Sequence, residues 1–311
     1  MAAVTLADIR VGLATKCDQA VIRTMELNEQ FLQKMVFDDA TSPSTGADSP
    51  LTYSWKVETA PAIATTRTIG SEGTQTKASK ESKLLNLGVI NSLYTMDRAL
   101  AMASNAELRY QAEAATRAVI NKFNYDMING TVAANGYDGI KTSLTGSDTE
   151  VSTTLNISTM TEAIALELDA LLKKAMKKCL RKPDYLIANT DTILKIDMAG
   201  TILGFHRQEM DELGMVHDYY GGVEIKDFGT YYGASQEDIC ADGDVYFVCL
   251  GYKELVGVCP LTKSAFIKSI LPDFNQAGAV KNGEVEMVTA IALKNSRAAS
   301  RVTGLVLTAA E

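Results

Sequence analysis

The sequence predicts an α+β fold, with long helices in its first half and most of its strands in its second half. Long segments with apolar residues at helical spacing precede residue 180, and several short β-prone runs follow it. Of the 311 residues, 46% are hydrophobic and 22% charged, as in a globular protein of about two domains with a substantial core. This composition argues against a disordered chain, a collagen-like repeat and a coiled-coil rod.

The charge balance and the cysteines restrict the function classes. Lys plus Arg number 30 and Asp plus Glu 38, a net charge of −8, whereas a free-standing DNA-binding domain normally has a basic surface. An acidic chain can still line a container for nucleic acid. The five cysteines are widely spread without a C-x-x-C pair. They therefore predict buried or half-buried thiols in a reducing cytoplasm, not a zinc site or a disulfide scaffold.

Neither a signal peptide nor a membrane span is expected. The start, Met1–Val4, shows no basic region followed by an apolar stretch. No apolar run approaches the roughly 18 to 20 residues that a bilayer crossing needs.

The first element in chain order is a long amphipathic helix. Apolar residues recur at spacings of three and four from Ile9 to Met35, which predicts one stripe along about eight turns. We expect this stripe to pack on its own domain or to reach across a neighbouring subunit. The segment Asp38–Pro50 is rich in Ser, Thr, Pro and Gly and predicts a linker.

A long hairpin arm follows the linker. Leu51–Thr59 alternates, with Tyr53 and Trp55 on one face, and predicts a strand. Lys83–Leu93 has similar strand character. The stretch Pro61–Ser82 between them has few large apolar side chains and cannot bury much of itself. Long loops of this kind are usually functional or disordered, so we expect a surface outside the protomer to hold the arm.

Two capping motifs predict the starts of two more helices. Ser104 and Glu107 have capping-box spacing, and an apolar stripe follows as far as Gly130, where glycine tolerates a left-handed cap. Ser104–Ile128 spans 25 residues, about 37 Å as a helix, a length that suits a structural plate. Thr159 and Glu162 predict the second start in the same way, before a helix that ends ahead of Pro183.

The end of this second helix is strongly basic. Six cations lie within ten residues: Lys173, Lys174, Lys177, Lys178, Arg181 and Lys182. They fit a nucleic-acid or phosphate contact, or they complement the helix dipole, an effect of about 0.3 to 1 kcal/mol each. The dipole interpretation needs no partner and is preferred, but the sequence leaves both open.

Beyond Asp184 the pattern becomes strand–helix–strand. The β-prone runs are Tyr185–Ala188, Gly222–Phe228, Asp244–Leu250, Glu254–Val258, Glu284–Lys294 and Ser300–Thr308, and Asp191–Ala199 predicts a short helix. Asp242–Gly243 predicts a turn into a strand rather than a calcium loop, because the EF-hand spacing is missing.

No familiar catalytic or metal-binding motif occurs in the sequence. The two histidines, His206 and His217, are not spaced as metal ligands, and no nucleophile elbow or phosphate-binding loop is present. We therefore expect no catalytic residue, no cofactor and no metal ion. An enzyme with unrecognised carboxylate chemistry stays a hypothesis, since 38 acidic residues could contain such a pair.

The order of the elements is accompanied by several short motifs. They are Asn129–Thr131 followed by Gly136–Ile140, Pro183–Asn189, Ile196–Gly200, Gly221–Ile225, and Gly243–Asp244 before Val245–Val248. Together they resemble the major capsid proteins of tailed bacteriophages, whose Hong Kong-type fold is shared with encapsulin shells and the herpesvirus capsid floor. One motif departs from the family, because Val223–Glu224 lacks its proline.

The resemblance implies a division of the chain into four parts. These are an N-terminal arm at 1–50, an extended β-hairpin loop at 51–92, a peripheral domain with a long spine helix at 93–183 and 281–311, and an axial domain at 184–280. In this family the axial domains meet around five-fold and six-fold axes, and the extended loop lies over the neighbouring subunit.

The function implied by the resemblance is structural. The chain would self-assemble through hexamers and pentamers into an icosahedral shell around double-stranded DNA, in a virion built in the host cytoplasm. Portal and scaffold proteins would be partners, a decoration protein an optional one, and no membrane would be involved. An encapsulin-type cargo shell is the close alternative. A tail or connector protein and a cytosolic enzyme are the others.

The candidate assembly contacts lie on the arm, the long helix and the basic helix end. They are Arg67, Glu72, Lys77, Lys80, Lys83, Glu107, Arg109, Lys173 and Lys177. Some family members cross-link a loop lysine to a neighbour's asparagine, but nothing singles out one lysine here, so we do not assign that chemistry. Some members begin with a cleavable scaffolding segment. Here the first helix starts near Leu6, so we expect scaffolding from a separate protein or from a segment already removed.

Overall fold

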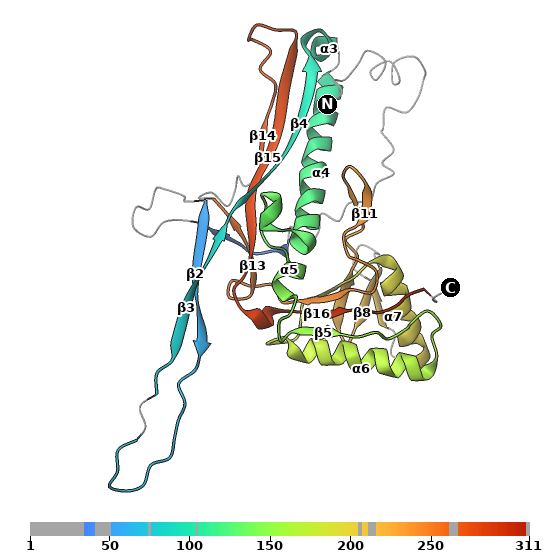
Figure 1. Ribbon diagram of the computed structural model, residues 1–311. Helices are drawn as coiled ribbons and strands as arrows, with labels where there is room; N and C mark the ends of the chain where they lie inside the picture. The colour runs from blue at the N-terminus through green and yellow to red at the C-terminus, as the bar shows by residue number, and fades with distance from the viewer. Residues whose placement is uncertain are drawn as a thin grey trace.

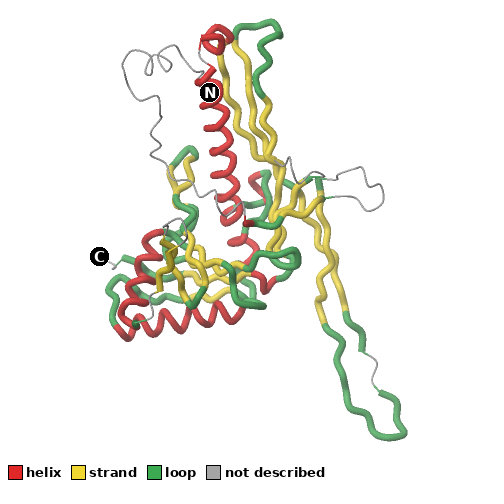
Figure 2. The backbone as a smooth tube through the Cα atoms, turned by 180° about the vertical axis from the view of Figure 1, so that it is seen from behind, coloured by secondary structure: helices red, strands yellow, loops and turns green. Residues whose placement is uncertain are grey.

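Two bodies, each built on its own β-sheet, carry a hairpin that projects away from both (Figures 1 and 2). The computed structural model describes residues 34–40, 51–73, 76–103, 105–204, 207–210, 216–260 and 267–308. The mixture of helices and strands confirms the predicted α+β class.

The upright body in Figure 1 consists of a five-stranded sheet and one long helix. Its strands are β1 (Phe37–Asp39), β13 (Leu255–Cys259), β15 (Val280–Leu293), β14 (Ile267–Ile270) and β4 (Gly88–Asp97). The long strand β15 pairs antiparallel with β13, β14 and β4, whereas β1 joins the edge parallel to β13. The short helix α3 (Arg98–Ala103) leads from β4 into α4 (Asn105–Asn129).

Helix α4 lies along β4 and β15 and turns its predicted apolar stripe toward them. Ala115, Val119, Phe123 and Met127 of the stripe are buried in the core of the upright body. Ser104 lies outside the described residues, so its cap is untested, and the Glu107 carboxylate accepts a hydrogen bond from Gln111 Nε2 at 2.8 Å.

The glycine that follows α4 serves another purpose than the one predicted. Gly130 does not adopt a positive φ. A Cβ there would lie 2.3 Å from the Asp126 carbonyl oxygen and 2.6 Å from that of Tyr137. Close backbone packing therefore requires the glycine, and the expected left-handed cap is wrong. The chain continues through the 3-10 turn Val132–Ala134 and α5 (Ile140–Leu144).

The second body is built on a seven-stranded sheet. Its order is β5 (Glu150–Ser152), β16 (Ala299–Thr303), β12 (Val245–Val248), β6 (Tyr185–Ile187), β9 (Val223–Lys226), β8 (Val216–Tyr220) and β7 (Arg207–Met210). Helices α6 (Glu162–Lys178) and α7 (Thr190–Leu203) pack on it with a shared apolar core. The N-cap of α6 is Thr161, whose hydroxyl accepts from the Ile164 amide. The predicted cap at Thr159 is therefore wrong by two residues.

A buried ion pair ties this sheet together. Arg301 of β16 donates to Asp244 Oδ2 at 2.6 Å and to Glu150 Oε1 at 3.3 Å. Tyr246 also donates to Asp244, at 3.1 Å. Arg301 and Asp244 are both buried, so the Asp244 carboxylate depends on Arg301 for the compensation of its charge, whereas Arg301 also contacts Glu150.

The remaining small elements fasten the bodies locally. The hairpin of β10 (Thr230–Tyr232) and β11 (Gln236–Asp238) lies against α4, and the 3-10 turn Ser296–Ala298 joins β15 to β16. Asn121 of α4 donates to the Thr230 carbonyl at 3.1 Å and accepts from the Tyr232 amide at 3.0 Å. The Tyr125 and Tyr231 rings stack at 4.4 Å.

The predicted domain boundaries stay a prediction, and the sheets show how the chain crosses them. Helix α6 and strand β16, assigned to the peripheral ranges, pack on the seven-stranded sheet. Strands β13 and β14, assigned to 184–280, pair with β15 in the five-stranded sheet. Each body is therefore assembled from several separate segments of the chain.

Other predictions for the N-terminal region and the cysteines have mixed outcomes. The predicted helix from Ile9 lies almost wholly outside the described residues, as do residues 41–50 of the linker. Asp38 and Asp39 belong to β1, so the linker prediction is wrong there. Four cysteines lie in the described part, namely Cys179, Cys240, Cys249 and Cys259; each is buried and none forms a disulfide.

No described helix has the length and apolarity that a bilayer crossing requires. Among the described residues, no group of three or more His, Cys, Asp or Glu side chains is placed to hold a metal ion.

Candidate functional site

The projecting hairpin is largely uncovered by the rest of the described protomer. Its strands β2 (Thr52–Ala60) and β3 (Ser79–Asn86) pair antiparallel, with an irregularity between Glu58 and Ala60. They form a separate two-stranded sheet among the described strands. Every described residue from Glu58 to Leu84 is exposed. The predicted hairpin is confirmed, although its second strand begins at Ser79, inside the predicted loop.

The loop at the far end of the hairpin is organised by its own hydrogen bonds. Arg67 Nη1 donates to the Ser71 carbonyl at 2.8 Å, and the Ser71 hydroxyl donates to the Thr68 carbonyl at 2.9 Å. Thr76 Oγ1 donates to the Ile63 carbonyl at 2.7 Å across the loop. The Ile69 side chain at the turn is fully exposed, with a relative accessibility of 102%, and Ile63 is 68% exposed. The loop thus presents both apolar side chains to solvent instead of burying them against the protomer.

A polar cluster anchors the base of the hairpin to the five-stranded sheet. Asp38 Oδ2 of β1 accepts from the Tyr53 hydroxyl of β2 at 2.5 Å and from Lys294 Nζ at 3.1 Å. The Lys294 ammonium lies 5.1 Å from the Tyr53 ring centroid and 4.0 Å from that of Tyr252. These four side chains, hereafter the base anchor, join β1, the hairpin, the loop between β12 and β13, and the segment after β15.

Contacts within the base anchor shift the pKa values of Asp38 and Tyr53. Burial raises the pKa of Asp38, but hydrogen bonds from Tyr53 and Lys294 and the lysine charge outweigh it, so the pKa lies below the ordinary 3.8. Burial and the hydrogen bond to Asp38 raise the pKa of Tyr53 well above its ordinary value. Near pH 7 Asp38 is therefore a carboxylate and Tyr53 a neutral phenol that donates to it.

An apolar contact supports the same base. Ala40, Val256, Val258 and Ala292 form a small buried cluster on the five-stranded sheet, and the hairpin packs Tyr53, Trp55, Leu85 and Leu87 against it. The Leu87 amide donates to the Leu51 carbonyl at 2.9 Å and closes the hairpin at this end. The inner end of the hairpin is thus fixed, and the remainder reaches into solvent.

A glycine in the neighbouring strand leaves the space into which a side chain of β1 packs. Phe37 faces Gly257 across the parallel pair β1–β13. A Cβ at Gly257 would lie 2.4 Å from Phe37 Cε1, so the ring occupies the space that any larger residue would fill. The Gly257 amide donates to the Val36 carbonyl at 2.9 Å, and the Ala40 amide to the Cys259 carbonyl at 2.8 Å.

The structure brings five of the nine predicted contact residues together. Arg67, Glu72, Lys77, Lys80 and Lys83 are all exposed on the hairpin. Arg109 is exposed and Glu107 half-buried near the start of α4, and Lys173 and Lys177 are exposed on α6 in the other body. The nine residues therefore form no single site, and their role in assembly stays a prediction.

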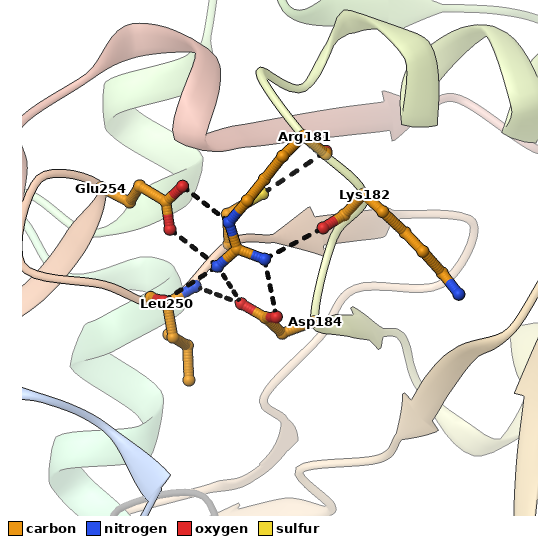
Figure 3. A network of polar contacts seen from close by, with 6 residues as sticks. Arg181, Lys182, Asp184, Leu250 and Glu254 are labelled. Atoms are coloured by element: carbon orange, nitrogen blue, oxygen red, sulfur yellow. Dashed lines mark hydrogen bonds and ion pairs between the residues drawn. The ribbon is translucent and has the colours of Figure 1, made fainter.

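The basic run after residue 172 separates into different environments. Lys173 pairs with Asp169 at 2.7 Å, and Lys178 Nζ donates to the Glu150 carbonyl at 2.8 Å. Arg181 lies beyond the end of α6. It is engaged by the carboxylates of Asp184 and Glu254 and by the Leu250 carbonyl, at 2.6–3.0 Å (Figure 3). The dipole interpretation therefore does not apply to Arg181, which clamps two loops together.

Sequence reasoning missed the base anchor. Asp38 stood in a polar stretch that predicted a linker, and its partner Lys294 is 256 residues away. The alternation of Tyr53 and Trp55 was a signal for a buried face, but nothing in the sequence indicated what that face contacts.

The chain is similar to known proteins in its structure but not detectably in its sequence. No family model and no curated protein matches the sequence. The holo-SrpI encapsulin complex from Synechococcus elongatus PCC 7942 matches with a TM-score of 0.65 at 11% identity, covering 99% of both chains. The capsid of Myoviridae phage XM1 matches with a TM-score of 0.61 at 11% identity, covering 98% of this chain and 99% of that one.

The chain has the Hong Kong-type capsid fold. Its projecting hairpin is the extended loop of that fold and α4 is its spine helix. A third similar structure is the major capsid protein of phage G, solved together with decoration proteins. It has a TM-score of 0.56 at 11% identity and covers 94% of this chain and 93% of that one. The likeness therefore extends over the whole capsid fold and not over a single domain.

Proposed function

We propose that this chain is the subunit of a closed protein shell, a major capsid protein that assembles through hexamers and pentamers around double-stranded DNA. The observation that carries the proposal is the extended loop, which is fixed at its base and exposed from Glu58 to Leu84 over every described residue. Contacts between identical subunits that close into rings can cover such a surface. The capsid fold, matched over nearly the whole chain, supports the same conclusion.

The proposed function is mechanical rather than catalytic. Its partners are further copies of the chain, the packaged DNA, portal and scaffold proteins and, as in the phage G structure, a decoration protein. The shell would be assembled in the host cytoplasm and form the capsid of a virion. Contact with DNA would not depend on base sequence, because phosphate contacts alone carry no sequence information.

A cargo shell of the encapsulin type is a second candidate. The encapsulin match has a TM-score of 0.65, so the fold accommodates either use. The two candidates predict the same closed shell and differ in its contents.

Two measurements on purified particles test these proposals. Electron microscopy of the chain expressed alone or with its scaffold should show closed shells or capsomer rings of uniform size. Particles from the source cell are then treated with nuclease and opened. Protected double-stranded DNA supports the capsid, and a stoichiometric protein cargo without DNA supports the encapsulin alternative. A chain that stays monomeric at high concentration in both settings contradicts both.

A further inference from the structure

Three asparagines of the chain are followed directly by glycine, namely Asn129, Asn135 and Asn282. An asparagine in this sequence can lose its side-chain amide without an enzyme, because the backbone nitrogen of the next residue attacks the side-chain carbonyl. A glycine at the next position has no side chain that hinders this approach. The reaction needs a free carboxamide, a free amide nitrogen and a backbone that can rotate. The fold meets these conditions differently at the three sites.

Hydrogen bonds protect Asn129, the last residue of α4. Its side-chain Nδ2 donates to the Ile239 carbonyl at 2.6 Å, and the residue is half-buried. The amide of the following Gly130 donates to the Asp126 carbonyl at 2.8 Å. Both groups that would have to react are therefore already engaged.

The long strand β15 protects Asn282. In the antiparallel ladder of β15 and β4, Asn282 pairs with Thr95, and the following Gly283 pairs with Tyr94. Gly283 is buried, and a Cβ there would lie 2.3 Å from Cζ of the Tyr94 ring. The backbone around Asn282 therefore cannot rotate unless the strand separates from its neighbour.

Asn135 lies in the turn between α4 and α5 and has neither kind of restraint. It follows the 3-10 turn Val132–Ala134, with a φ of 59° and a ψ of 20°, and is the one non-glycine residue of positive φ in the described part of the chain. Its own amide donates to the Val132 carbonyl at 3.1 Å. Asn135 is exposed, and within the described residues neither its carboxamide nor the Gly136 amide has a hydrogen-bond partner.

We propose that Asn135 is a site of spontaneous deamidation in the native chain, with water as the second reactant. Hydroxide removes the proton of the Gly136 amide, and this nitrogen attacks Asn135 Cγ. The bond between Cγ and the side-chain nitrogen breaks, and the leaving nitrogen takes a proton from water and departs as ammonia, which restores the hydroxide. Water then opens the resulting succinimide at either carbonyl and leaves aspartate or isoaspartate. The net reaction consumes one water and releases one ammonia.

The reaction changes the charge of the turn. Each event replaces a neutral amide by a carboxylate, so the net charge of the chain becomes more negative than −8. Aspartate occupies the left-handed region as asparagine does, whereas isoaspartate lengthens the backbone of the turn by one carbon. Because the site is exposed, we expect little change in stability. The inference does not depend on the proposed shell function, since the reaction needs only water at the turn.

The test is incubation of the full-length native chain in mildly alkaline buffer, at a concentration that keeps it unassembled, followed by peptide mass mapping. We expect Asn135 to be converted first, to a mixture of aspartate and isoaspartate, while Asn129 and Asn282 keep their amides. The same chain unfolded in urea is the control, and there all three sites should react at comparable rates. The rate at Asn135 should rise with pH, because the attack requires the deprotonated Gly136 nitrogen.

A pair of glycine variants tests the reaction route. Gly136→Ala should slow the conversion several-fold, because the new methyl group hinders the attack. A Cβ at Gly136 would have one close neighbour, the Thr131 carbonyl oxygen at 3.4 Å, so the fold should be retained. The matched control is Gly73→Ala in the extended loop, where a Cβ would meet nothing nearer than Arg67 Cδ at 4.0 Å. It should leave the rate at Asn135 unchanged.

The mapping of the native chain decides the outcome even if Gly136→Ala fails to fold. An Asn135 amide that persists in the native chain for the time in which the unfolded chain loses it would overturn the proposal. So would conversion of Asn129 or Asn282 in the native chain at the same rate, or a rate at Asn135 that does not depend on pH.

Discussion

Adding a single methyl group at Gly257 should detach β1 from the edge of the five-stranded sheet. In Gly257→Ala the new Cβ would lie 2.4, 2.6 and 3.0 Å from three carbons of the Phe37 ring. The ring must therefore move, and it carries β1 with it. Because Asp38 of β1 holds Tyr53 and Lys294, the base of the extended loop loses its support in the same step.

The expected loss of stability follows from the free energy needed to displace the Phe37 ring. Overpacking a tightly packed site typically costs about 1–3 kcal/mol. The alternative to strain is release of β1, which gives up its two flanking backbone hydrogen bonds, each worth about 1 kcal/mol net, and the contacts of Asp38. We expect a loss of about 2–3 kcal/mol in the free energy of unfolding, whichever route is cheaper.

The single tryptophan of the chain reports this change directly. Trp55 packs at the base of the extended loop, so its emission should shift to longer wavelength in Gly257→Ala, and urea unfolding followed by the same signal gives the energy. A double-mutant cycle with Phe37→Ala supplies the control. If the ring is the obstacle, adding the methyl group in the Phe37→Ala background should cost less than about 0.5 kcal/mol. An equal cost in both backgrounds would refute the steric explanation.

Three further predictions concern other parts of the molecule. Reversing the exposed lysine charges of α6 should change the Tm by no more than about 1 °C, because the i,i+4 ion pair of Lys173 with Asp169 is of a kind worth about 0.3–0.5 kcal/mol. Particle yield or protected DNA should fall instead, and a large loss of Tm with normal assembly would favour the dipole interpretation. The variants are Lys173→Glu, Lys174→Glu and Lys177→Glu. The pKa of Asp38 is lowered in the folded state, so its contribution is present above 3.8 and lost as the pH falls through the folded value. Trp55 emission should accordingly be constant from pH 7 to 5 and change only below about pH 4, and a transition above pH 5 would exclude Asp38 as its origin. Arg301→Ala leaves Asp244 buried without its main partner and should cost about 3–5 kcal/mol in urea unfolding, with Arg301→Lys as the milder control; a loss below 1 kcal/mol would mean that water reaches Asp244.

The helical spacing and the strand-like alternation of apolar residues allowed the main helices and strands to be predicted from the sequence. The stripe of α4 and the faces of β2 are local patterns, since each is set by neighbours within a few residues. The ends of elements were less predictable. Thr159 and Thr161 both precede α6, and only the folded chain shows that Thr161 accepts the amide hydrogen bond.

Most features that could not be predicted from the sequence depend on contacts between residues that are far apart in the chain. The run Lys83–Leu93 was predicted as one strand, yet it contributes to β3 of the extended loop and to β4 of the five-stranded sheet. The change occurs at Gly88, where a Cβ would approach the Tyr137 ring at 3.3 Å. Similarly, the base anchor depends on Asp38 and Lys294, which no local pattern relates.

The most direct test of the shell hypothesis removes the exposed end of the extended loop and leaves its base intact. Ala60 pairs with Ser79, so residues 61–78 can be replaced by a two-residue Asn-Gly turn that suits a tight hairpin. Sedimentation velocity then compares the variant with the wild type under assembly conditions. We predict that the wild type sediments as closed particles and that the variant remains as folded protomers or capsomers with unchanged Trp55 emission. Particles of normal size from the shortened chain would contradict the account, because they would show that the loop makes no contact that the shell requires.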